Sequence, residues 1–488
     1  MIHRPEGMNL RFVAHLTGLT VLAVGAGILL SAGVSLLYGD DDVPALLVSA
    51  AAAVVAGLPM YLTTRLRGQQ FIGYREGFLA VGLGWMAAMI FGAVPYVAYG
   101  TFGIIDALFE SMSGFTTTGA SVLVDYNQPH GLLFWRSLTH WYGGMGIVVL
   151  FIAVLPSMGA GAMKLFSAES PGPVPERLTP RIRDTARNLW LIYVGMTVAQ
   201  SVALIIAGMP IFDAVTHSFG SMATGGFSPR ATSVAAFNNV TFELIIAFFM
   251  FLAGGNFALY FAALRGDPLR LFRSREWRLY AAIAAGSIVA IAISLMIARS
   301  HFSVGHALRE ATFQVISVQS TTGFVSADFD KWNTLAKLIL VLLMVIGGCA
   351  GSTAGGFKVA RLLVLLKSTR HELTRQMHPQ AVLPLRAGNQ VISEVVRVAV
   401  LQYFALYMII WATGSLLVAA TGTDLITAAT SVVATFNNIG PGLGPVGATM
   451  NYAFLQPFAK CVLIAMMVIG RLELFAILLP FTRGFWRG

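Results

Sequence analysis

Four glycine-containing turns recur in this sequence, and their residue types and spacing could form a binding site. They read Thr-Thr-Thr-Gly-Ala at 116–120, Ala-Thr-Gly-Gly-Phe at 223–227, Ser-Thr-Thr-Gly-Phe at 320–324 and Asn-Asn-Ile-Gly-Pro at 437–441. With Gly119, Gly225, Gly323 and Gly440 taken as centres, they recur at intervals of 106, 98 and 117 residues. None contains Asp, Glu, Lys or Arg, so each turn offers a ligand only neutral oxygens and amides.

A ring of neutral carbonyl oxygens can replace the hydration shell of a monovalent cation. Glycine lets the backbone turn its carbonyls inward, because it tolerates positive φ. A charged ring would favour divalent cations or anions, so neutral turns favour K⁺, with Na⁺ or Rb⁺ as lesser candidates. The alternative is close helix packing, the commonest role of glycine in membrane proteins. Recurrence of the turn at the same place in four repeats favours the ring.

The elements that must position these turns are membrane-spanning helices. Of 488 residues, 56% are hydrophobic and 11% are charged, whereas soluble domains carry about 25% charged residues. The mean hydropathy is +0.74. Runs of about 20 apolar residues span a bilayer as helices, and ten candidates occur, at 12–37, 43–64, 78–100, 137–163, 188–212, 244–264, 279–298, 338–357, 398–423 and 461–481. The sequence therefore predicts an all-α polytopic membrane protein.

A short segment with helical spacing precedes each turn. The segments begin at Asp106, Asp213, His306 and Asp424, and each is too short to span, which is typical of a re-entrant helix. Asp is a good helix N-cap, so we expect three of them to cap these helices. The pattern predicts four helix–pore loop–helix repeats with pseudo-four-fold symmetry after an N-terminal helix pair. The expected boundaries are 1–70 for the pair and 71–164, 165–265, 266–370 and 371–488 for the repeats.

The run at 338–357 is expected to break at Gly347. The small residues that follow, before the basic Lys358, are Gly348, Gly351, Ser352, Thr353, Gly355 and Gly356. Each glycine costs a helix about 1 kcal/mol relative to alanine, so the sequence predicts a loop inside the membrane that obstructs the ion path or moves aside. A packing kink is the alternative. A phosphate-binding loop is disfavoured, since its Gly-x4-Gly-Lys spacing is absent.

Arg471 lies in the last apolar run, next to Gly470, at a mid-membrane level. An ionisable residue inside a membrane is functional by default. We expect it to face the path near the loop as a positive barrier, with loop carbonyls or Glu473 as partners. A purely structural Arg471–Glu473 pair is the alternative.

Other polar residues in apolar surroundings leave more open. Glu110 either bonds backbone behind the first turn or simply caps and packs. His140 and His217 are expected to be packed histidines rather than ligands. Cys349 and Cys461 give neither a disulfide framework nor a metal spacing. No nucleophile–base set or metal cluster is visible, so we expect no enzyme.

The net charge of +10 is an orientation signal rather than a sign of nucleic-acid binding. With both termini cytoplasmic, Lys and Arg gather in the inside segments, as the positive-inside rule requires. The outside segments hold Asp40, Asp41, Asp42, Asp125, Asp328 and Asp330. The basic segments at 170–180 and 371–389 could dock a soluble partner or anionic lipid.

Three motifs carry a resemblance to a known family. Ser-Gly-Phe-Thr-Thr-Thr-Gly-Ala-Ser at 113–121, Asn-Asn-Ile-Gly-Pro-Gly-Leu-Gly at 437–444 and Gly-Gly-Cys-Ala-Gly-Ser-Thr-Ala-Gly-Gly-Phe-Lys at 347–358 resemble the TrkH branch of bacterial potassium transporters. The wider superfamily includes the KtrB and plant HKT proteins. The resemblance covers essentially the whole chain.

The resemblance implies a gated, carbonyl-lined pore for K⁺ uptake across the bacterial cytoplasmic (inner) membrane. It implies K⁺ as the transported ion, no covalent cofactor, a homodimer and a cytosolic TrkA-type regulatory ring that binds NAD or adenine nucleotides. Glycine rather than serine at 119 favours K⁺ over Na⁺. The filter positions implied are Thr117, Thr118, Gly119, Thr224, Gly225, Thr322, Gly323, Asn438, Ile439 and Gly440.

The alternative function is a K⁺ symporter coupled to H⁺ or Na⁺. Many coupled carriers are built from inverted repeats, whereas the repeats expected here all run in parallel. A chain of intramembrane carboxylates, which proton coupling would favour, is also absent from the sequence. A pore is therefore the preferred interpretation.

Overall fold

The computed structural model describes residues 8–64, 74–154, 182–298, 303–378, 386–387, 390–472 and 479–486. Within these ranges the regular secondary structure is helical, apart from the two-residue antiparallel strands β1 (Arg386–Ala387) and β2 (Gln390–Val391). The predicted all-α architecture is confirmed. The segment 170–180 and Glu473 lie outside the described residues.

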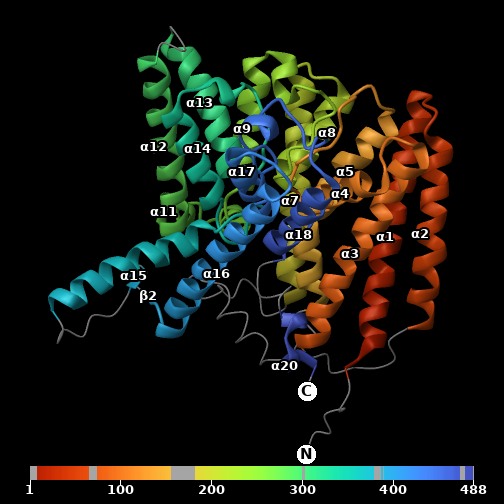
Figure 1. Cartoon of the computed structure of the whole chain (residues 1–488), viewed down its shortest axis with the longest axis horizontal. Helices are drawn as coiled ribbons and strands as arrows, with labels where there is room; N and C mark the ends of the chain where they lie inside the picture. The colour runs from red at the N-terminus through yellow and green to blue at the C-terminus, as the bar shows by residue number, and fades with distance from the viewer. Residues whose placement is uncertain are drawn as a thin grey trace, which may run out of the picture.

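The N-terminal pair consists of α1 (Leu10–Tyr38) and α2 (Val43–Thr63), which pack along each other and against α3 (Tyr74–Tyr99). Gly39 ends α1 in a left-handed conformation (φ 73°), which is the usual glycine cap. The pair lies on one flank of the molecule, drawn in red at the right of Figure 1. The green helices of the third unit form the opposite flank.

Four units follow, each with a long helix, a short helix and a further helix. Unit 1 contains α3 (Tyr74–Tyr99), α4 (Ile104–Phe115) and α5 (His130–Val154). Unit 2 contains α7 (Ile182–Ile206), α8 (Ile211–Ala223), η2 (Ser233–Phe237), α9 (Val240–Ala253), α10 (Phe257–Leu264) and α11 (Leu269–Arg273). Unit 3 contains α12 (Arg275–Ile297), α13 (Val304–Gln319), η3 (Phe329–Lys331), α14 (Thr334–Ile346) and α15 (Val359–Met377). Unit 4 contains α16 (Glu394–Ala419), α17 (Leu425–Phe436), η4 (Gly444–Val446) and α18 (Pro457–Arg471), followed by η5 (Leu479–Phe481) and α20 (Arg483–Trp486).

The short helices α4, α8, α13 and α17 are hereafter the re-entrant helices. The first three begin earlier than the sequence predicted, whereas α17 begins where expected. Asp424 caps α17 through a bond from Thr427 N at 3.1 Å, as expected. The other two N-cap predictions, for Asp106 and Asp213, are wrong. Asp106 and Asp213 lie in the first turns of α4 and α8, and Ser303 caps α13 by accepting from His306 N at 3.2 Å. A carboxylate in the first turn still favours the positive end of the helix dipole.

The expected uninterrupted span at 244–264 is also wrong. Helices α9 and α10 meet at a 98° bend. The bend has a local cause: the Asn256 side chain accepts from Ala258 N at 2.9 Å and starts a new helix. The Gly254 carbonyl, freed from helix bonding, accepts instead from Cys349 N at 2.8 Å. The bend therefore joins unit 2 to the loop of unit 3.

The predicted break at Gly347 is confirmed. Helix α14 ends at Ile346, Gly347 has φ 70°, and α15 begins only at Val359. The unit boundaries expected from the sequence stay predictions, and residue 370 falls inside α15. In Figure 1, α15 extends away from the body of the molecule.

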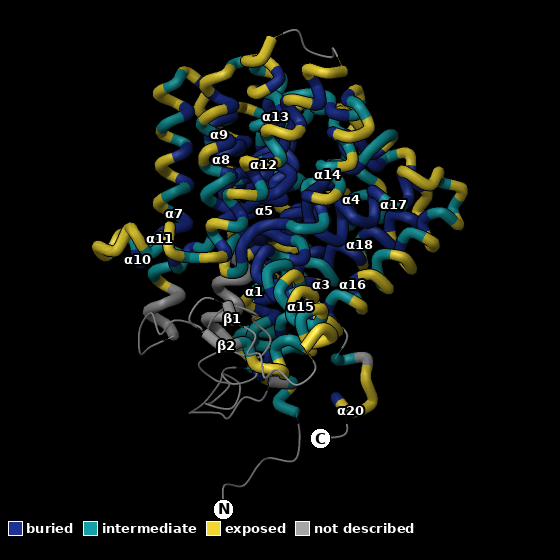
Figure 2. The backbone as a smooth tube through the Cα atoms, turned by 90° about the vertical axis from the view of Figure 1, so that its left-hand side faces the viewer, coloured by how far each residue is buried: buried dark blue, intermediate teal, exposed yellow. Residues whose placement is uncertain are grey.

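Among the described residues, six helices are long and apolar enough to cross a membrane, or seven if the bent α9–α10 pair is one span. The buried backbone gathers at the centre of the molecule, around the re-entrant helices, α5 and α18 (Figure 2). Exposed apolar side chains such as Leu37 (85%) and Ile206 (80%) lie on the outer helices. Apolar side chains on the outside suit contact with lipid, and the polar turns lie in the interior.

Candidate ion pathway

The four re-entrant helices end in the same backbone turn. In the first, Thr117 is left-handed (φ 54°) and Thr118 N donates to the Ser113 carbonyl at 2.9 Å. This is the long bond of a Schellman cap. The corresponding amides of Gly225, Thr322 and Ile439 make the same bond at 2.8, 2.9 and 2.9 Å.

The shared geometry defines four equivalent turns, named turn 1 (117–119), turn 2 (224–226), turn 3 (321–323) and turn 4 (438–440). Each begins with a left-handed residue, and these are Thr117, Thr224, Thr321 and Asn438, with φ 54°, 55°, 58° and 55°. Each ends with a glycine at positive φ, and these are Gly119, Gly226, Gly323 and Gly440, with φ 79°, 82°, 79° and 99°.

This register corrects the sequence interpretation at two positions. The centre of turn 2 corresponds to Gly226 rather than Gly225, because only Gly226 has the positive φ shared by the other three glycines. Thr321, absent from the expected filter positions, is the equivalent of Thr117. The sequence alone does not show which of two adjacent glycines is equivalent to Gly119, whereas their backbone angles do.

The turns follow one another in a closed ring. In each turn, a Cβ atom built on the last glycine would meet the middle carbonyl oxygen of the next turn. The pairs are Gly119 with Gly225, Gly226 with Thr322, Gly323 with Ile439 and Gly440 with Thr118, the last at 2.8 Å. The contacts run from turn 1 through turns 2 and 3 to turn 4 and back to turn 1. No side chain larger than hydrogen fits at the four glycines without displacing a carbonyl.

The ring is buried and uncharged. Thr118 and Asn438 are fully buried, and the Asn438 amide donates to Thr118 Oγ1 at 2.9 Å, which ties turn 4 to turn 1. The re-entrant helices direct their C-termini, the negative ends of their dipoles, at this ring. Carbonyls, hydroxyls and helix dipoles all favour a cation there.

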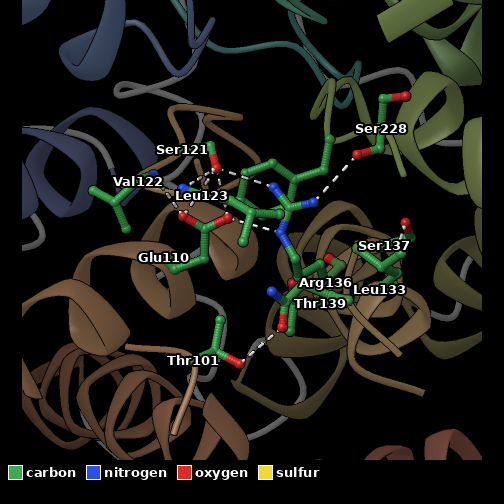
Figure 3. Close-up of polar contacts among 12 residues, drawn as sticks. Thr101, Glu110, Ser121, Val122, Leu123, Leu133, Arg136, Ser137, Thr139 and Ser228 are labelled. Atoms are coloured by element: carbon green, nitrogen blue, oxygen red, sulfur yellow. Dashed lines mark hydrogen bonds and ion pairs between the residues drawn. The ribbon is translucent and has the colours of Figure 1, made fainter. Parts of the chain in front are cut away.

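A buried ion pair braces the backbone just after turn 1 (Figure 3). Arg136 Nε lies 2.8 Å from Glu110 Oε1, with side-chain exposures of 3% and 0%. Glu110 also accepts from Val122 N at 2.9 Å, and Arg136 donates to the Ser228 carbonyl at 3.2 Å. Of the two roles open for Glu110, the backbone bond behind the turn is therefore confirmed. The pair joins the segments that follow turns 1 and 2.

The position nine residues before the turn glycine has a related role in units 1 to 3. Glu110 occupies it in unit 1, His217 in unit 2 and Gln314 in unit 3. His217 Nε2 lies 3.0 Å from Ser228 Oγ, and the side-chain oxygen of Gln314 accepts from Ser326 N at 2.8 Å. His217 is fully buried, as a packed histidine should be. These side chains hold the chain that leaves each turn.

Residues 347–358, between α14 and α15, form a loop against the C-terminal ends of the re-entrant helices. Gly355 N donates to Thr321 Oγ1 at 2.8 Å, and Thr353 Oγ1 donates to the Met222 carbonyl at 3.0 Å. A Cβ on Gly355 would meet the Asn437 carbonyl oxygen. The loop of unit 3 thus touches units 2, 3 and 4 next to the ring.

Three glycines of the loop adopt positive φ, which glycine tolerates better than other residues. Gly347, Gly351 and Gly356 have φ 70°, 72° and 81°. The Gly348 carbonyl accepts from Val359 N at 2.9 Å, and Ser352 Oγ donates to the Cys349 carbonyl at 2.6 Å. Lys358, itself at φ 73°, is the N-cap of α15. The loop is an ordered turn structure rather than a kinked helix.

Arg471, the last residue of α18, reaches this loop. Its Nη1 donates to the Thr353 carbonyl at 2.7 Å and its Nη2 to the Gly143 carbonyl at 3.0 Å. The side chain is 4% exposed, and both of these hydrogen bonds go to backbone carbonyls rather than to carboxylates. Arg471 therefore links the loop to units 1 and 4 and leaves a cationic group buried beside the ring.

A cavity of about 500 Å³ opens beyond turn 4, where η3 meets η4. Asp328 and Asp330 contribute to its wall, and Asp330 Oδ1 accepts from Gly444 N at 2.9 Å. Burial raises the pKa of Asp330 above its ordinary value. The cavity therefore presents two carboxylates, which attract cations.

Sequence reasoning missed Arg136 as well as Gly226 and Thr321. Arg136 could have been noticed in the sequence as a lone arginine at the edge of an apolar run, 26 residues after Glu110. Among the described residues, no group of three or more His, Cys, Asp or Glu could hold a metal ion.

Apolar helices on the outside and a closed ring of neutral carbonyls within define a multi-pass membrane protein of the ion-transport class. The TrkH family model, described as a cation transport protein, matches residues 47–278 and 288–485. The chain belongs to the TrkH family, which is a family of transporters and not of enzymes.

Individual relatives agree over almost the whole chain. The Trk system potassium uptake protein TrkH of Salmonella typhimurium is 41% identical over 485 residues, which cover 98% of this chain and 100% of the relative. The TrkG protein of Escherichia coli K12 is 33% identical over 487 residues, with 98% and 99% coverage. The crystal structure of the potassium transporter TrkH from Vibrio parahaemolyticus matches with a TM-score of 0.89 at 35% identity, and covers 98% of this chain and 100% of that one.

Proposed function

We propose that this protein takes up K⁺ through a gated pore whose selective part is the ring of turns 1 to 4. The observation that carries the proposal is the closed chain of contacts between each turn glycine and the next turn's middle carbonyl. Such a ring offers oxygens at fixed positions in place of water, which is how neutral filters bind a dehydrated monovalent cation. The relatives named above are potassium uptake proteins or transporters, which supports K⁺ as the ion.

The proposed filter keeps the ten positions expected from the sequence and adds the two that the backbone register requires. The members are Thr117, Thr118, Gly119, Thr224, Gly225, Gly226, Thr321, Thr322, Gly323, Asn438, Ile439 and Gly440. The first residue of each turn is left-handed without being glycine, which costs of order 1–3 kcal/mol per residue. Such strained conformations persist only where the surrounding structure stabilises them. All four turns have the same strained first residue.

The proposed gate is the loop 347–358 together with Arg471. Its support is the position of the loop at the helix C-termini and its bonds to Thr321 and Met222. A buried guanidinium beside the path raises the energy of a cation there. Moving the loop requires breaking a few hydrogen bonds, each worth about 0.5–1.5 kcal/mol.

The same proposal covers the membrane, the oligomeric state and the regulatory partner. The protein lies in the bacterial cytoplasmic membrane with both termini cytoplasmic, and it works as a homodimer with a TrkA-type nucleotide-binding regulatory ring. The basic helix α15 and the segment at 371–389 are the proposed docking region for that ring. Helix α15 carries the exposed Arg370 and Arg375 and continues directly from the gating loop, so force on it reaches the gate.

Ion flux from proteoliposomes tests the proposal. Purified protein should carry K⁺ and Rb⁺ down their gradients and Na⁺ at least about tenfold more slowly, a difference of 1.4 kcal/mol. The flux should follow the membrane potential with no change of internal pH. Obligatory H⁺ or Na⁺ movement with K⁺ would support the symporter instead, and equal K⁺ and Na⁺ flux would refute the selective ring.

A further inference from the structure

The middle position of turn 2 differs from its equivalents. Thr118, Thr322 and Ile439 carry side chains there, whereas turn 2 has Gly225. Its amide makes the same bond as theirs, to the Gly220 carbonyl at 2.8 Å. Gly225 is not among the residues with positive φ, so its backbone conformation does not require glycine.

The ring of His140 explains this glycine. A Cβ atom on Gly225 would run into the imidazole, with Cε1 at 2.7 Å and Nδ1 and Cγ closer still. His140 lies on α5 of unit 1 and is fully buried. The imidazole therefore fills the volume that the side chain of the middle residue would need, and it comes from the neighbouring unit.

The imidazole also bonds the backbone of this region. Phe227 N donates to His140 Nε2 at 3.2 Å, so the ring is neutral with its proton on Nδ1. The Phe227 and His140 ring centroids are 4.2 Å apart. One helical turn earlier, Arg136 donates to the Ser228 carbonyl at 3.2 Å, and its guanidinium lies 4.2 Å from the Phe227 centroid. Two side chains of α5 thus fix the backbone from 225 to 228.

We propose that His140 is a positioning residue for ion selectivity. By filling the space at Gly225 and accepting the Phe227 amide, it sets the place of the Gly225 carbonyl, which is the oxygen that meets Gly119. Selectivity in this ring thereby depends on a side chain that faces away from the ion. The inference rests on the proposed function of the ring.

The test is a double-mutant cycle with His140→Ala and Gly225→Thr, which gives turn 2 the middle residue of turns 1 and 3. The readout is the K⁺/Na⁺ permeability ratio from reversal potentials in planar bilayers. Each single change should lower the ratio about tenfold, within the range of coupling seen between contacting residues. The double variant should recover most of the loss, because the new side chain occupies the space that the imidazole leaves.

A second pair of variants separates the hydrogen bond from volume. His140→Gln keeps a neutral acceptor and should hold the ratio within about twofold, whereas His140→Leu removes the acceptor and should lower it about tenfold, near the cost of one unmet buried amide. His130→Ala, at the beginning of the same helix and 40% exposed, is the matched control and should leave the ratio unchanged. Melting temperatures in detergent verify that each variant folds.

The outcomes separate the two proposals. A wild-type protein without K⁺ selectivity refutes the function of the ring itself. A selective wild type whose ratio survives both His140→Ala and His140→Leu overturns the role of His140 and leaves the ring intact. Should His140→Ala fail to fold, the comparison of His140→Gln with His140→Leu decides the question alone.

Discussion

The ring of turns and the loop 347–358 lie in contact, yet they are held in opposite ways. Every unit contributes one turn to the ring, and each turn is fixed by its own helix cap and by the next turn. The loop comes from unit 3 alone and is held by hydrogen bonds to several helices, including Gly355 N to Thr321 Oγ1 at 2.8 Å and Arg471 Nη1 to the Thr353 carbonyl at 2.7 Å. Displacing one turn disturbs its neighbours on both sides, whereas the loop contributes none of the four contacts that close the ring.

This difference explains how one chain can have a selective part and a gating part in contact with each other. Selectivity requires oxygens that stay within fractions of an ångström, so it suits the part with cooperative support. Gating requires two states separated by a few kcal/mol, so it suits the part that lies outside the closed ring of contacts. The predictions below separate the two regions.

The largest effect is expected from Gly119→Ala. A residue other than glycine at φ 79° is strained by roughly 1–2 kcal/mol, and its Cβ would displace the Gly225 carbonyl. The K⁺/Na⁺ flux ratio in proteoliposomes should fall at least about tenfold. Gly103→Ala, in open space at φ −66°, is the matched control and should keep the wild-type ratio. Equal ratios in both variants would contradict a tightly closed ring.

Next comes Glu110→Gln, which tests the support behind turn 1. It leaves Arg136 buried without its counter-charge, and breaking such a pair costs about 3–5 kcal/mol. The free energy of unfolding in detergent should fall by that order, with a reduced K⁺/Na⁺ ratio in the protein that remains folded. Glu394→Gln, in a pair whose glutamate side chain is 68% exposed, should change neither quantity measurably. A stable Glu110→Gln variant would show that the ring needs no such brace.

Arg471→Ala should act on the loop and not on the ring. It removes the bonds to the Thr353 and Gly143 carbonyls and the buried positive charge. Basal K⁺ flux should rise several-fold, roughly the effect of one or two hydrogen bonds to a charged group, while the K⁺/Na⁺ ratio stays the same. Arg471→Lys keeps the charge and should lie between. Unchanged flux in the alanine variant would argue against the barrier.

The smallest effect is expected from Tyr452→Phe. The Tyr452 hydroxyl donates to the Gly440 carbonyl at 2.7 Å, and its ring packs on Phe109 with centroids 5.6 Å apart. Phenylalanine keeps the packing and loses one neutral hydrogen bond, worth about 0.5–1.5 kcal/mol. The K⁺/Na⁺ ratio should shift by less than about tenfold. A complete loss of selectivity would mean that one peripheral bond, and not the mutual contact of the turns, holds the ring.

Much of the fold could be predicted from the sequence because lipid imposes simple patterns. Long apolar runs located most helices, and the short segments before the glycines located the re-entrant ones. The helix starts were less accurate, since Asp106 and Asp213 suit a first turn as well as a cap. The bend at Asn256 was missed because its cause is partly distant: the Gly254 carbonyl bonds Cys349 of another unit.

The four turns could be predicted from the sequence, but the register of turn 2 could not. Neutral, recurring turns indicated a cation site, and the glycine-rich stretch after Gly347 indicated the loop. Gly225 and Gly226 could not be told apart, because the distinction lies in backbone angles that the composition does not encode. The contact between His140 and Gly225 joins residues 85 positions apart and could be found only in three dimensions.

The most direct test of the ring is to locate an ion in it. Crystals of the protein soaked in Rb⁺ or Tl⁺ should show anomalous density on the axis that Gly119, Gly226, Gly323 and Gly440 encircle, and this density should be lost in Gly119→Ala. Density found only outside that axis, with the ring empty at saturating Rb⁺, would contradict the account.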